Sequence, residues 1–418
     1  MTEERSRIHQ VGPNPELWQP LSTGPLGAHV DPFAQQMVGQ GYASATAKYA
    51  MRVLAAFSTW LQRQDLTAPD LNAQHVEDFL HDHPWRSRPR RRDRAVLGQV
   101  IAQLRDHGVI PLPVVEVHNG ACERVTGDLQ HYLLHQRCLV PATVSSYLDV
   151  VRRFLHDRFG SHPLRLEALS TQDITDFMVR QHRQYSLTYA KLNTTALRSF
   201  FRFLLQAGAS TTDLAKAVPT VPNWRLSGLP KFMKAEDVEC LLHSCDRQTA
   251  KGQRDYAILL LLARLGLRAG EVVALTLDDL AWEAGELLVR GKGTRQDRLP
   301  LPHEVGEALV TYICEGRPPS TTRQVFIRAR APHCGFAHSQ GISTIVSRAL
   351  DRAGLEPALK GAHLLRHSLA TQLLQNGASL VEIGELLRHQ HIETTRIYAK
   401  VDQPALRALA LPWPGGEV

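Results

Sequence analysis

The chain has 418 residues, of which 43% are hydrophobic and 21% are charged, proportions that are ordinary for a folded, water-soluble protein. This length exceeds a single hydrophobic core, so we expect two or three domains, and the formal net charge of +7 favours a polyanionic partner such as nucleic acid. The longest apolar run, residues 257–263, is too short to cross a bilayer, and the first ten residues lack the apolar segment of a secretion signal. We therefore expect a cytoplasmic protein without a membrane partner.

The N-terminal half contains an internal repeat. Apolar residues recur at helical spacing after Ser44 and again after Pro141, at an offset of 97 residues. The segments that begin at Leu71 and Leu169 repeat at an offset of 98 residues. These offsets predict two successive helical units, although two helical hairpins packed only for stability would give the same periodicity.

Helix-capping residues mark the ends of helices in both units. Asn72 and Ser170 stand at N-cap positions, and Asp173 is an acidic capping partner three residues after Ser170. Gly108 and Gly208 are placed to end the last helix of each unit in the left-handed conformation. The expected organisation is an N-terminal extension (1–27), a first helical unit (28–112), a second helical unit (120–215), a linker (216–230) and a C-terminal domain (231–418).

Basic residues concentrate at two places before the C-terminal domain. Six arginines within nine residues, opposed in that run only by Asp93, predict contacts with phosphates, although such runs are more often solvated faces. The proline-containing linker predicts an extended basic strap. The candidate DNA-binding residues are Arg86, Arg88, Arg90, Arg91, Arg92, Arg94, Arg225 and Lys231.

The pattern changes after residue 231 from all-helical to mixed. One helix is expected to begin at Lys234. A second is expected to span residues 254–265 and to end at Gly266. Residues 286–289 and 298–301 predict short strands on either side of the glycine-rich turn 291–294, and helices follow residue 343. The expected fold is therefore multidomain and mainly α, with two N-terminal helical units before a mixed α/β catalytic domain that contains a small antiparallel sheet.

Residues suited to phosphoryl transfer appear in this C-terminal domain. A tyrosine can attack a phosphodiester and form a phosphotyrosine ester, and guanidinium groups can neutralise the charge of the transition state. Arg268 follows a helix break, where Glu271 is placed to orient it, and His363 and Arg366 share a helix face at a spacing of three. His367 directly follows and could compete with His363, but it is expected to point elsewhere on the helix and is secondary. The candidate catalytic residues are Arg268, Lys292, His363, Arg366, His389 and Tyr398.

The stretch from His363-Leu-Leu-Arg366-His367 through Leu387-Arg388-His389 to Thr394-Thr-Arg-Ile-Tyr398 resembles the catalytic box of the tyrosine recombinase (phage integrase) family. This resemblance implies that Tyr398 is the nucleophile. By the same resemblance, His363 would accept or position its proton, Lys292 would protonate the leaving 5′ oxygen, and His389 would bind the scissile phosphate. It also implies that the second helical unit is a SAM-like core-binding domain, of which the first unit looks like an extra copy. Arg388 departs from the family pattern, which commonly has glycine there. This departure leaves two questions open: the backbone geometry at this position, and whether Arg388 makes an additional contact with DNA.

The resemblance implies a site-specific recombinase or integrase that acts on double-stranded DNA through a 3′-phosphotyrosine intermediate and a Holliday junction. No metal, ATP or other cofactor is expected. The implied assembly is a tetramer of this chain, or of this chain with a related recombinase, in the nucleoid, and the extra helical unit favours a mobile element. A type IB-like DNA-relaxing topoisomerase and an inactive DNA-binding regulator are the alternatives.

Overall fold

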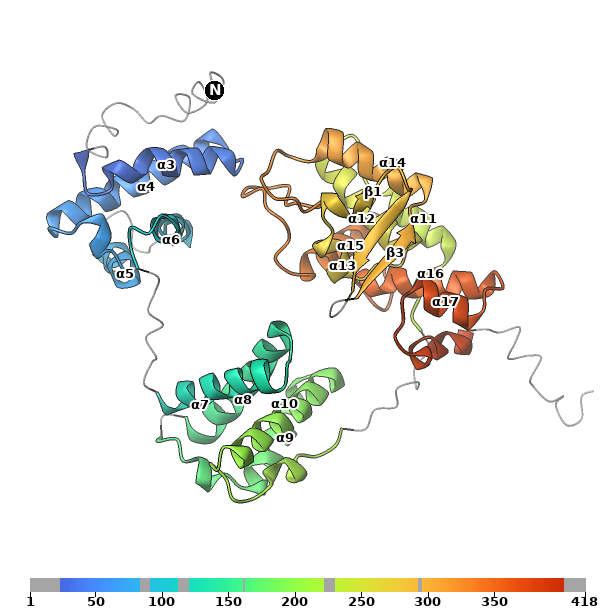
Figure 1. The fold of residues 1–418 in the computed structure, drawn as a ribbon, viewed down its shortest axis with the longest axis horizontal. Helices are drawn as coiled ribbons and strands as arrows, with labels where there is room; N and C mark the ends of the chain where they lie inside the picture. Colours follow the sequence, from blue (N-terminus) through green and yellow to red (C-terminus); the bar gives the residue numbers. More distant parts are fainter. Residues whose placement is uncertain are drawn as a thin grey trace, which may run out of the picture. The chain divides into compact units, whose positions relative to one another are not determined.

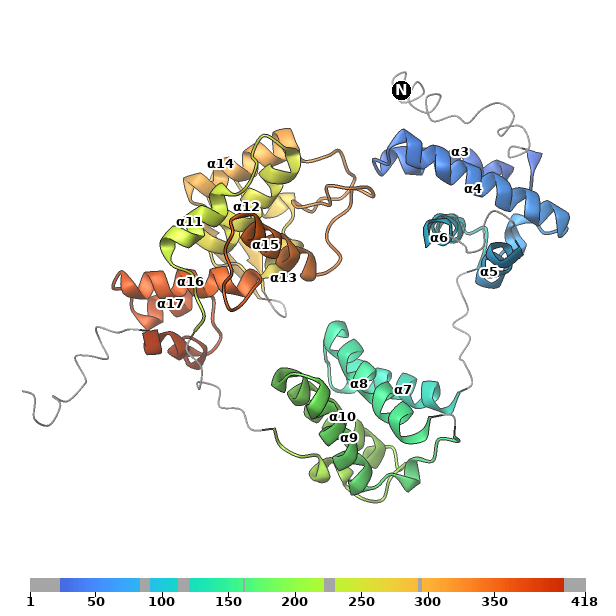
Figure 2. The ribbon, with the colours of Figure 1, turned by 180° about the vertical axis from the view of Figure 1, so that it is seen from behind.

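The computed structural model describes residues 23–82, 91–111, 120–160, 162–221, 230–291 and 295–401. These residues form separate hydrophobic cores, which belong to two helical bundles and a mixed C-terminal part (Figures 1 and 2). Each is described by itself. None of the described helices is long and apolar enough to cross a membrane.

The first bundle contains four helices among the described residues, and its core includes Phe33, Phe57 and Phe79. The Asn72 side chain accepts a hydrogen bond of 3.0 Å from the backbone of His75, as its predicted capping role requires. Gly108 has φ of +70°, the predicted left-handed stop. The helices are α3 (Gly27–Gly39), α4 (Ser44–Arg63), α5 (Ala73–Asp82) and α6 (Arg91–Asp106).

The second bundle repeats the order of a long helix, a short 3-10 turn and two further helices. Ser170 and Asp173 form the predicted capping box, and Gly208 has φ of +70°. Val218 is buried in this core, so the bundle continues past Lys216, where the sequence placed the start of the extended strap. Its helices are α7 (Ala121–His131), α8 (Pro141–Phe159), α9 (Thr171–Gln184) and α10 (Leu187–Gln206), and 3-10 helices follow α8 and α10 at Leu166–Ala168 and Leu214–Ala217.

The C-terminal part is organised around one buried helix, α12. It packs against α11, α13, α14, α15 and α16, and residues 257–262 have no exposed surface. A helix that is apolar on every side requires neighbours on every side. The helices are α11 (Ala235–His243), α12 (Ala250–Arg264), α13 (Ala269–Ala274), α14 (His303–Thr311), α15 (Gln340–Arg352), α16 (Ala362–Gln375) and α17 (Leu380–Leu386).

A small antiparallel sheet completes this part, in the order β1 (Leu280–Ala281), β2 (Glu286–Arg290) and β3 (Gln296–Pro300). Leu287 stands opposite both Leu280 and Leu299, so all three strands turn a leucine to the core. The two predicted strands are present, whereas β1 was missed because two residues are too few to show alternation. The predicted fold class, mainly α with a small antiparallel sheet, is confirmed.

Candidate active site

Tyr398 lies in the 3-10 helix Arg396–Val401 and is only 1% exposed. Its ring packs in a small apolar cluster with Ala370, Ile383 and Leu387, which come from α16 and the end of α17. Burial raises the pKa of Tyr398 to about 12, although the charge of Arg366 acts in the opposite direction. The phenol is therefore protonated at neutral pH and requires a base to react.

His367 is the ring next to this phenol: its Nδ1 lies 2.9 Å from the Tyr398 hydroxyl. The expectation that His367 points elsewhere is wrong, because positions 363 and 367 are four apart and lie on the same face of α16. Desolvation and the charges of His363 and Arg366 lower the pKa of His367. A neutral imidazole at this distance can accept the phenolic proton.

Arg268 stands at the N-cap of α13, directly after the chain turns at Gly266, whose φ is +58°. Its Nη1 donates to Glu271 Oε1 at 2.7 Å, and its backbone N–H donates to Glu271 Oε2 at 2.8 Å. The predicted orienting contact with Glu271 is therefore present. With 38% of its side chain exposed, Arg268 can still reach a ligand.

Arg366 lies deeper, at 4% exposure. Its Nη1 donates to the carbonyl of Gly266 and its Nη2 to the carbonyl of Leu387. These bonds fasten α16 to the turn before α13 and to the end of α17. Burial and the nearby charges of Arg268 and Arg388 lower the pKa of Arg366 to about 10, so the guanidinium remains charged at neutral pH.

The two remaining histidines complete the cluster. His363 is exposed at the start of α16, and partial desolvation with the charges of Arg366 and Arg268 lowers its pKa. His389 Nδ1 lies 2.7 Å from Thr395 Oγ1. Burial, then the charges around it, lower the pKa of His389 to about 4, so its ring is neutral. A neutral ring that accepts at Nδ1 carries its proton on Nε2, which can donate to a phosphate oxygen.

The structure thus brings five of the six predicted catalytic residues into one electrostatically coupled cluster: Arg268, His363, Arg366, His389 and Tyr398. Lys292 falls in the turn between β2 and β3, outside the described residues. His367 and Thr395 were not predicted for the site. The spacing of four from His363 was the available signal for His367, whereas no local pattern pointed to Thr395.

Arg388 keeps a glycine-like backbone, with φ of +54°, while its side chain is 4% exposed. Its Nη2 donates to Glu271 Oε2 at 2.8 Å. The side chain is therefore held inside the protein by an ion pair and does not extend outward as a DNA contact. This pairing, across 117 positions of sequence, had no local signal.

Few of the candidate DNA-binding residues are described. Arg92 stacks over the ring of Tyr49 at 5.1 Å, and Lys231 is exposed. Arg94 pairs with Glu77, so Asp93 is not the only acid that opposes the arginine run. The side chain of Arg91 and all of Arg86, Arg88, Arg90 and Arg225 lie outside the described residues.

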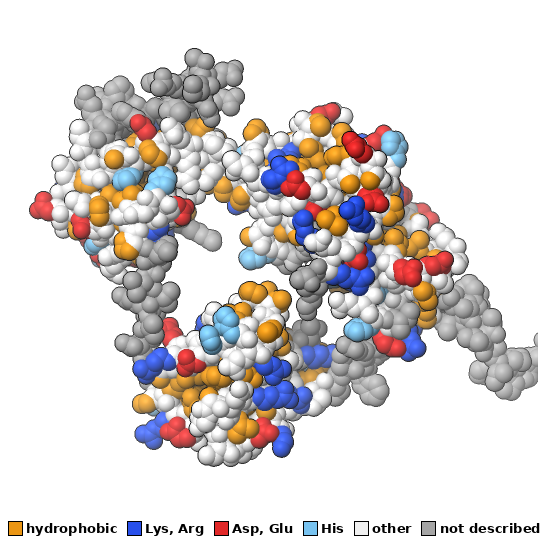
Figure 3. Space-filling view, viewed as in Figure 1, with side chains coloured by type: hydrophobic (Ala, Val, Ile, Leu, Met, Phe, Trp, Pro, Cys, Tyr) orange, Lys and Arg blue, Asp and Glu red, His pale blue; other side chains and the backbone are white. Residues whose placement is uncertain are grey.

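Basic side chains cover parts of the surface seen in Figure 3, over the second bundle and over the sheet of the C-terminal part. Between residues 120 and 221, twelve Lys and Arg stand against eight Asp and Glu, a formal charge of +4. On the sheet, Arg290, Arg295 and Arg298 are each paired with a carboxylate. Four cations of the second bundle are also paired: Arg152, Arg158, Arg180 and Lys216. The excess of four positive charges makes the second bundle a candidate for a surface that binds a polyanion.

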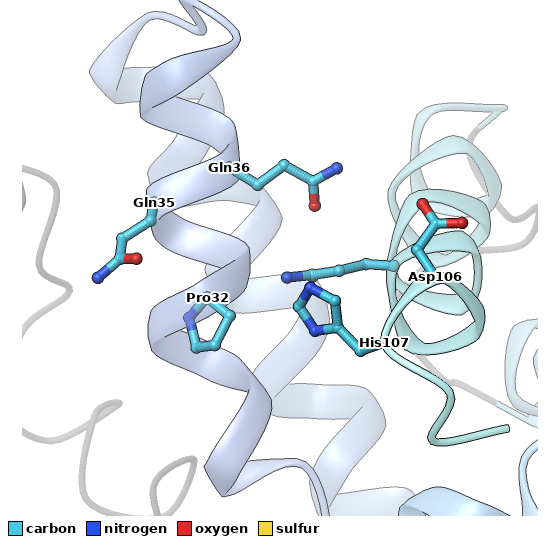
Figure 4. Close-up of a pocket in the computed structure, with 6 residues that line it drawn as sticks. Pro32, Gln35, Gln36, Asp106 and His107 are labelled. Carbon is cyan, nitrogen blue, oxygen red and sulfur yellow. The ribbon is translucent and has the colours of Figure 1, made fainter.

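A pocket lies between α3 and α6 of the first bundle (Figure 4). It contains none of the predicted catalytic residues, so it is distinct from the tyrosine cluster. Its lining is Pro32, Gln35, Gln36, Gln103, Asp106 and His107.

Two family models match the chain. Residues 231–404 match the phage integrase family, and residues 128–208 match the phage integrase N-terminal SAM-like domain. A protein of Sinorhizobium fredii (strain NBRC 101917 / NGR234) named "Putative integrase/recombinase y4rA" is 44% identical over 393 residues, which cover 94% of this chain and 95% of that protein. Tyrosine recombinase XerD of Listeria monocytogenes serotype 4b (strain F2365) is 34% identical over 67% of this chain and 95% of its own length.

The fold has a solved counterpart in the XerH site-specific recombinase bound to a palindromic difH substrate. The TM-score is 0.55 and the identity 22%, over 70% of this chain and 87% of XerH. With the two matched domains and the extent of the relatives, these similarities show that the chain belongs to the phage integrase family. It is a tyrosine recombinase, an enzyme that breaks and rejoins DNA in site-specific recombination.

Proposed function

We propose that this recombinase cleaves double-stranded DNA by direct attack of Tyr398 on the scissile phosphate. The Tyr398 oxygen forms a bond to phosphorus while the bond to the 5′ oxygen breaks, which leaves a 3′-phosphotyrosine and a free 5′-hydroxyl. The ester conserves the energy of the phosphodiester, so rejoining needs no ATP. The observation that carries this proposal is the 2.9 Å contact between His367 and a buried phenol beside Arg366.

The surrounding residues have separate roles in this proposal. His367 takes the phenolic proton, and His363 faces the phosphate with Arg268 and Arg366, whose charges oppose that of the pentacoordinate transition state. His389 donates from Nε2 to a phosphate oxygen. Lys292, carried by the turn between the strands, protonates the 5′ oxygen as it leaves.

Recombination would follow when the free 5′-hydroxyl of one duplex attacks the phosphotyrosine of another, which produces a Holliday junction. We propose that four protomers, of this chain or with a related recombinase, assemble on two DNA sites, and that the tail after residue 401 docks on a neighbouring protomer. A λ integrase dimer bound to a core site and the Tn1549 transposon integrase bound to a circular-intermediate DNA share this fold at TM-scores of 0.51 and 0.50. A mobile element is the proposed setting.

The helical bundles would hold the duplex. The second bundle, which continues to Val221, has excess positive charge and would clamp DNA against the catalytic domain, 231–418. The linker that follows would contribute Arg225, and the start of the catalytic domain would contribute Lys231. The first bundle, 28–112, would be an additional DNA-binding arm. XerD is matched over nearly its whole length by two thirds of this chain, which is consistent with an added N-terminal unit.

The proposal is tested with a library of nicked duplexes whose sequence is randomised on both sides of the nick. After cleavage the short fragment that carries the 5′-hydroxyl diffuses away, so the strand cannot be rejoined and the covalent complex accumulates. The complex is isolated on a denaturing gel, and its DNA is sequenced. We expect a selected sequence and a 3′-linked adduct with the wild-type protein, and none with Tyr398→Phe. An adduct that persists in the variant contradicts the assignment of the nucleophile. Adducts without sequence preference, together with relaxation of any supercoiled plasmid, would indicate a topoisomerase instead.

A further inference from the structure

Arg388 occupies a backbone conformation that normally favours glycine. Its φ of +54° lies in the left-handed region of backbone conformation, which is strained for a residue that has a Cβ. The side chain of Arg388 is turned inward and is 4% exposed. A strained residue held in place by buried polar contacts is a reason to look for a role in the neighbouring site.

The contacts of Arg388 lead to Arg268 by two routes. Glu271 Oε2 accepts from Arg388 Nη2 at 2.8 Å, while Glu271 Oε1 accepts from Arg268 Nη1 at 2.7 Å. In addition, Arg268 Nη2 donates to the backbone carbonyl of Arg388 at 3.4 Å. Arg388 therefore holds the carboxylate that orients Arg268 and also supplies a second acceptor for the same guanidinium.

Charge gives this arrangement a second consequence. A buried Glu271 paired with Arg268 alone would cancel the charge that Arg268 offers to a phosphate. Burial raises the pKa of Glu271, but the charge of Arg388 and the hydrogen bonds from Arg268 outweigh it, so the net pKa is lowered and Glu271 is ionised. With Arg388 present, the group of Arg268, Arg366, Arg388 and Glu271 carries two net positive charges, whereas without it the group would carry one.

We propose that Arg388 is a positioning residue for DNA cleavage, which compensates the charge of Glu271 and fixes the guanidinium of Arg268 toward the scissile phosphate. This inference rests on the proposed function, in which Arg268 binds that phosphate. Because Arg388 is buried, its effect belongs to the cleavage step and not to duplex affinity.

The test compares three variants on the duplex selected from the nicked library. Arg388→Met keeps much of the volume without the charge, Arg388→Gly suits the left-handed backbone, and Arg388→Lys keeps the charge. We expect the first two to slow adduct formation by about ten- to a hundredfold with less than a threefold change in duplex Kd, and Arg388→Lys to stay within about tenfold of wild type. Arg264→Met is the matched control, because Arg264 also pairs with carboxylates, Glu239 and Glu304, but contacts none of the cluster. Its rate should be that of wild type.

The decisive variant is Arg388→Met combined with Glu271→Gln. If Arg388 compensates the carboxylate, Glu271→Gln should slow adduct formation less in the Arg388→Met background than in the wild type, whereas two independent structural losses would be additive. An equal or larger cost of Glu271→Gln in the Arg388→Met background, or an Arg388→Gly that cleaves like wild type, would overturn the inference while the proposed function stands. An absent wild-type adduct would instead overturn the proposed function, and this inference with it.

Discussion

His363 and His367 lie one turn apart on α16, and each is a candidate for the base that takes the phenolic proton. Geometry favours His367, because its Nδ1 is 2.9 Å from the hydroxyl of Tyr398. The lowered pKa of His367 keeps the ring neutral at pH 7, as a base must be. His363 is exposed and has the two arginines as its charged neighbours, which suits a residue that faces the phosphate.

We expect His367→Gln to slow adduct formation by about a hundredfold or more, which is the usual contribution of a general base. The pH profile separates it from His363→Gln. Without its base, the rate should rise about tenfold per pH unit above neutrality, since only the ionised phenol reacts and its pKa is about 12. His363→Gln should keep the level profile of the wild type above pH 6.5. The reverse pattern would return the base role to His363.

The lowered pKa of His389 lets us predict how the stability of the catalytic domain depends on pH. In the unfolded chain His389 binds a proton below about pH 6.5, whereas in the folded protein its pKa is about 4. The unfolded state therefore binds more protons between these values, and stability falls as the pH falls through this window. We expect the free energy of opening α16 and α17, measured as protection from hydrogen exchange, to fall by on the order of 2 kcal/mol between pH 7 and pH 4.5.

Hydrogen exchange of peptides from α16 and α17 measures this loss, because it reports opening of these helices separately from the bundles. His389→Gln, which cannot titrate, is the control and should reduce the dependence, while His363 and His367, whose pKa values are also lowered, keep the remainder. An unchanged slope in that variant would assign the effect to other groups.

At the scale of elements, the break between α12 and α13 holds both guanidinium groups. Gly266 turns the chain with φ of +58°, its carbonyl accepts from Arg366, and two residues later Arg268 caps α13. A Cβ on Gly266 would lie 2.6 Å from Leu387 Cδ2, and Leu387 also supplies a carbonyl to Arg366. The turn and the end of α17 are therefore packed as one unit.

We expect Gly266→Ala to destabilise the catalytic domain by about 2–4 kcal/mol, through left-handed strain and a steric clash, and to slow adduct formation. Gly354→Ala is the matched control, since Gly354 has φ of +66° and no neighbour within 4 Å of the added Cβ. It should cost about 1 kcal/mol and leave the rate unchanged. Thermal unfolding and the adduct assay check both, and equal effects of the two substitutions would refute the packing argument.

Elements were predictable from sequence where their signals are local. The caps at Asn72 and Ser170 and the stops at Gly108, Gly208 and Gly266 depend on residues a few positions apart, and the structure confirms them. The strand β1 has no such signal, because its two residues are held only by pairing with β2. Similarly, Val218 belongs to the second bundle through long-range packing that no prolines or charges in the linker reveal.

At the scale of the whole molecule, the two bundles and the C-terminal part each have their own hydrophobic core. The core of the first bundle runs from Leu26 to Ile110 and includes no residue of the other cores. Removing residues 1–112 should therefore leave the remaining cores intact.

We expect the truncated chain, residues 113–418, to remain folded and to form the covalent adduct, but to bind duplex DNA at least tenfold more weakly, with a smaller salt dependence of its Kd. Fluorescence anisotropy at several salt concentrations measures both quantities. The full chain with its six clustered arginines replaced by glutamine is the companion variant. If it binds like wild type, the arginine run is a solvated face and the arm uses other residues.

The sequence by itself predicted the class of chemistry, because its motifs resemble those of the tyrosine recombinase family, and it predicted several helix ends, because caps and stops are recognised by residue type and short spacing. The tertiary structure decided which groups meet. His367 reaches Tyr398, Arg366 binds the Gly266 carbonyl 100 positions away, and Arg388 pairs with Glu271 across 117 positions. These contacts form only when α13, α16, α17 and the 3-10 helix of Tyr398 pack together, and so their geometry is set by the fold of the whole domain and not by any local pattern.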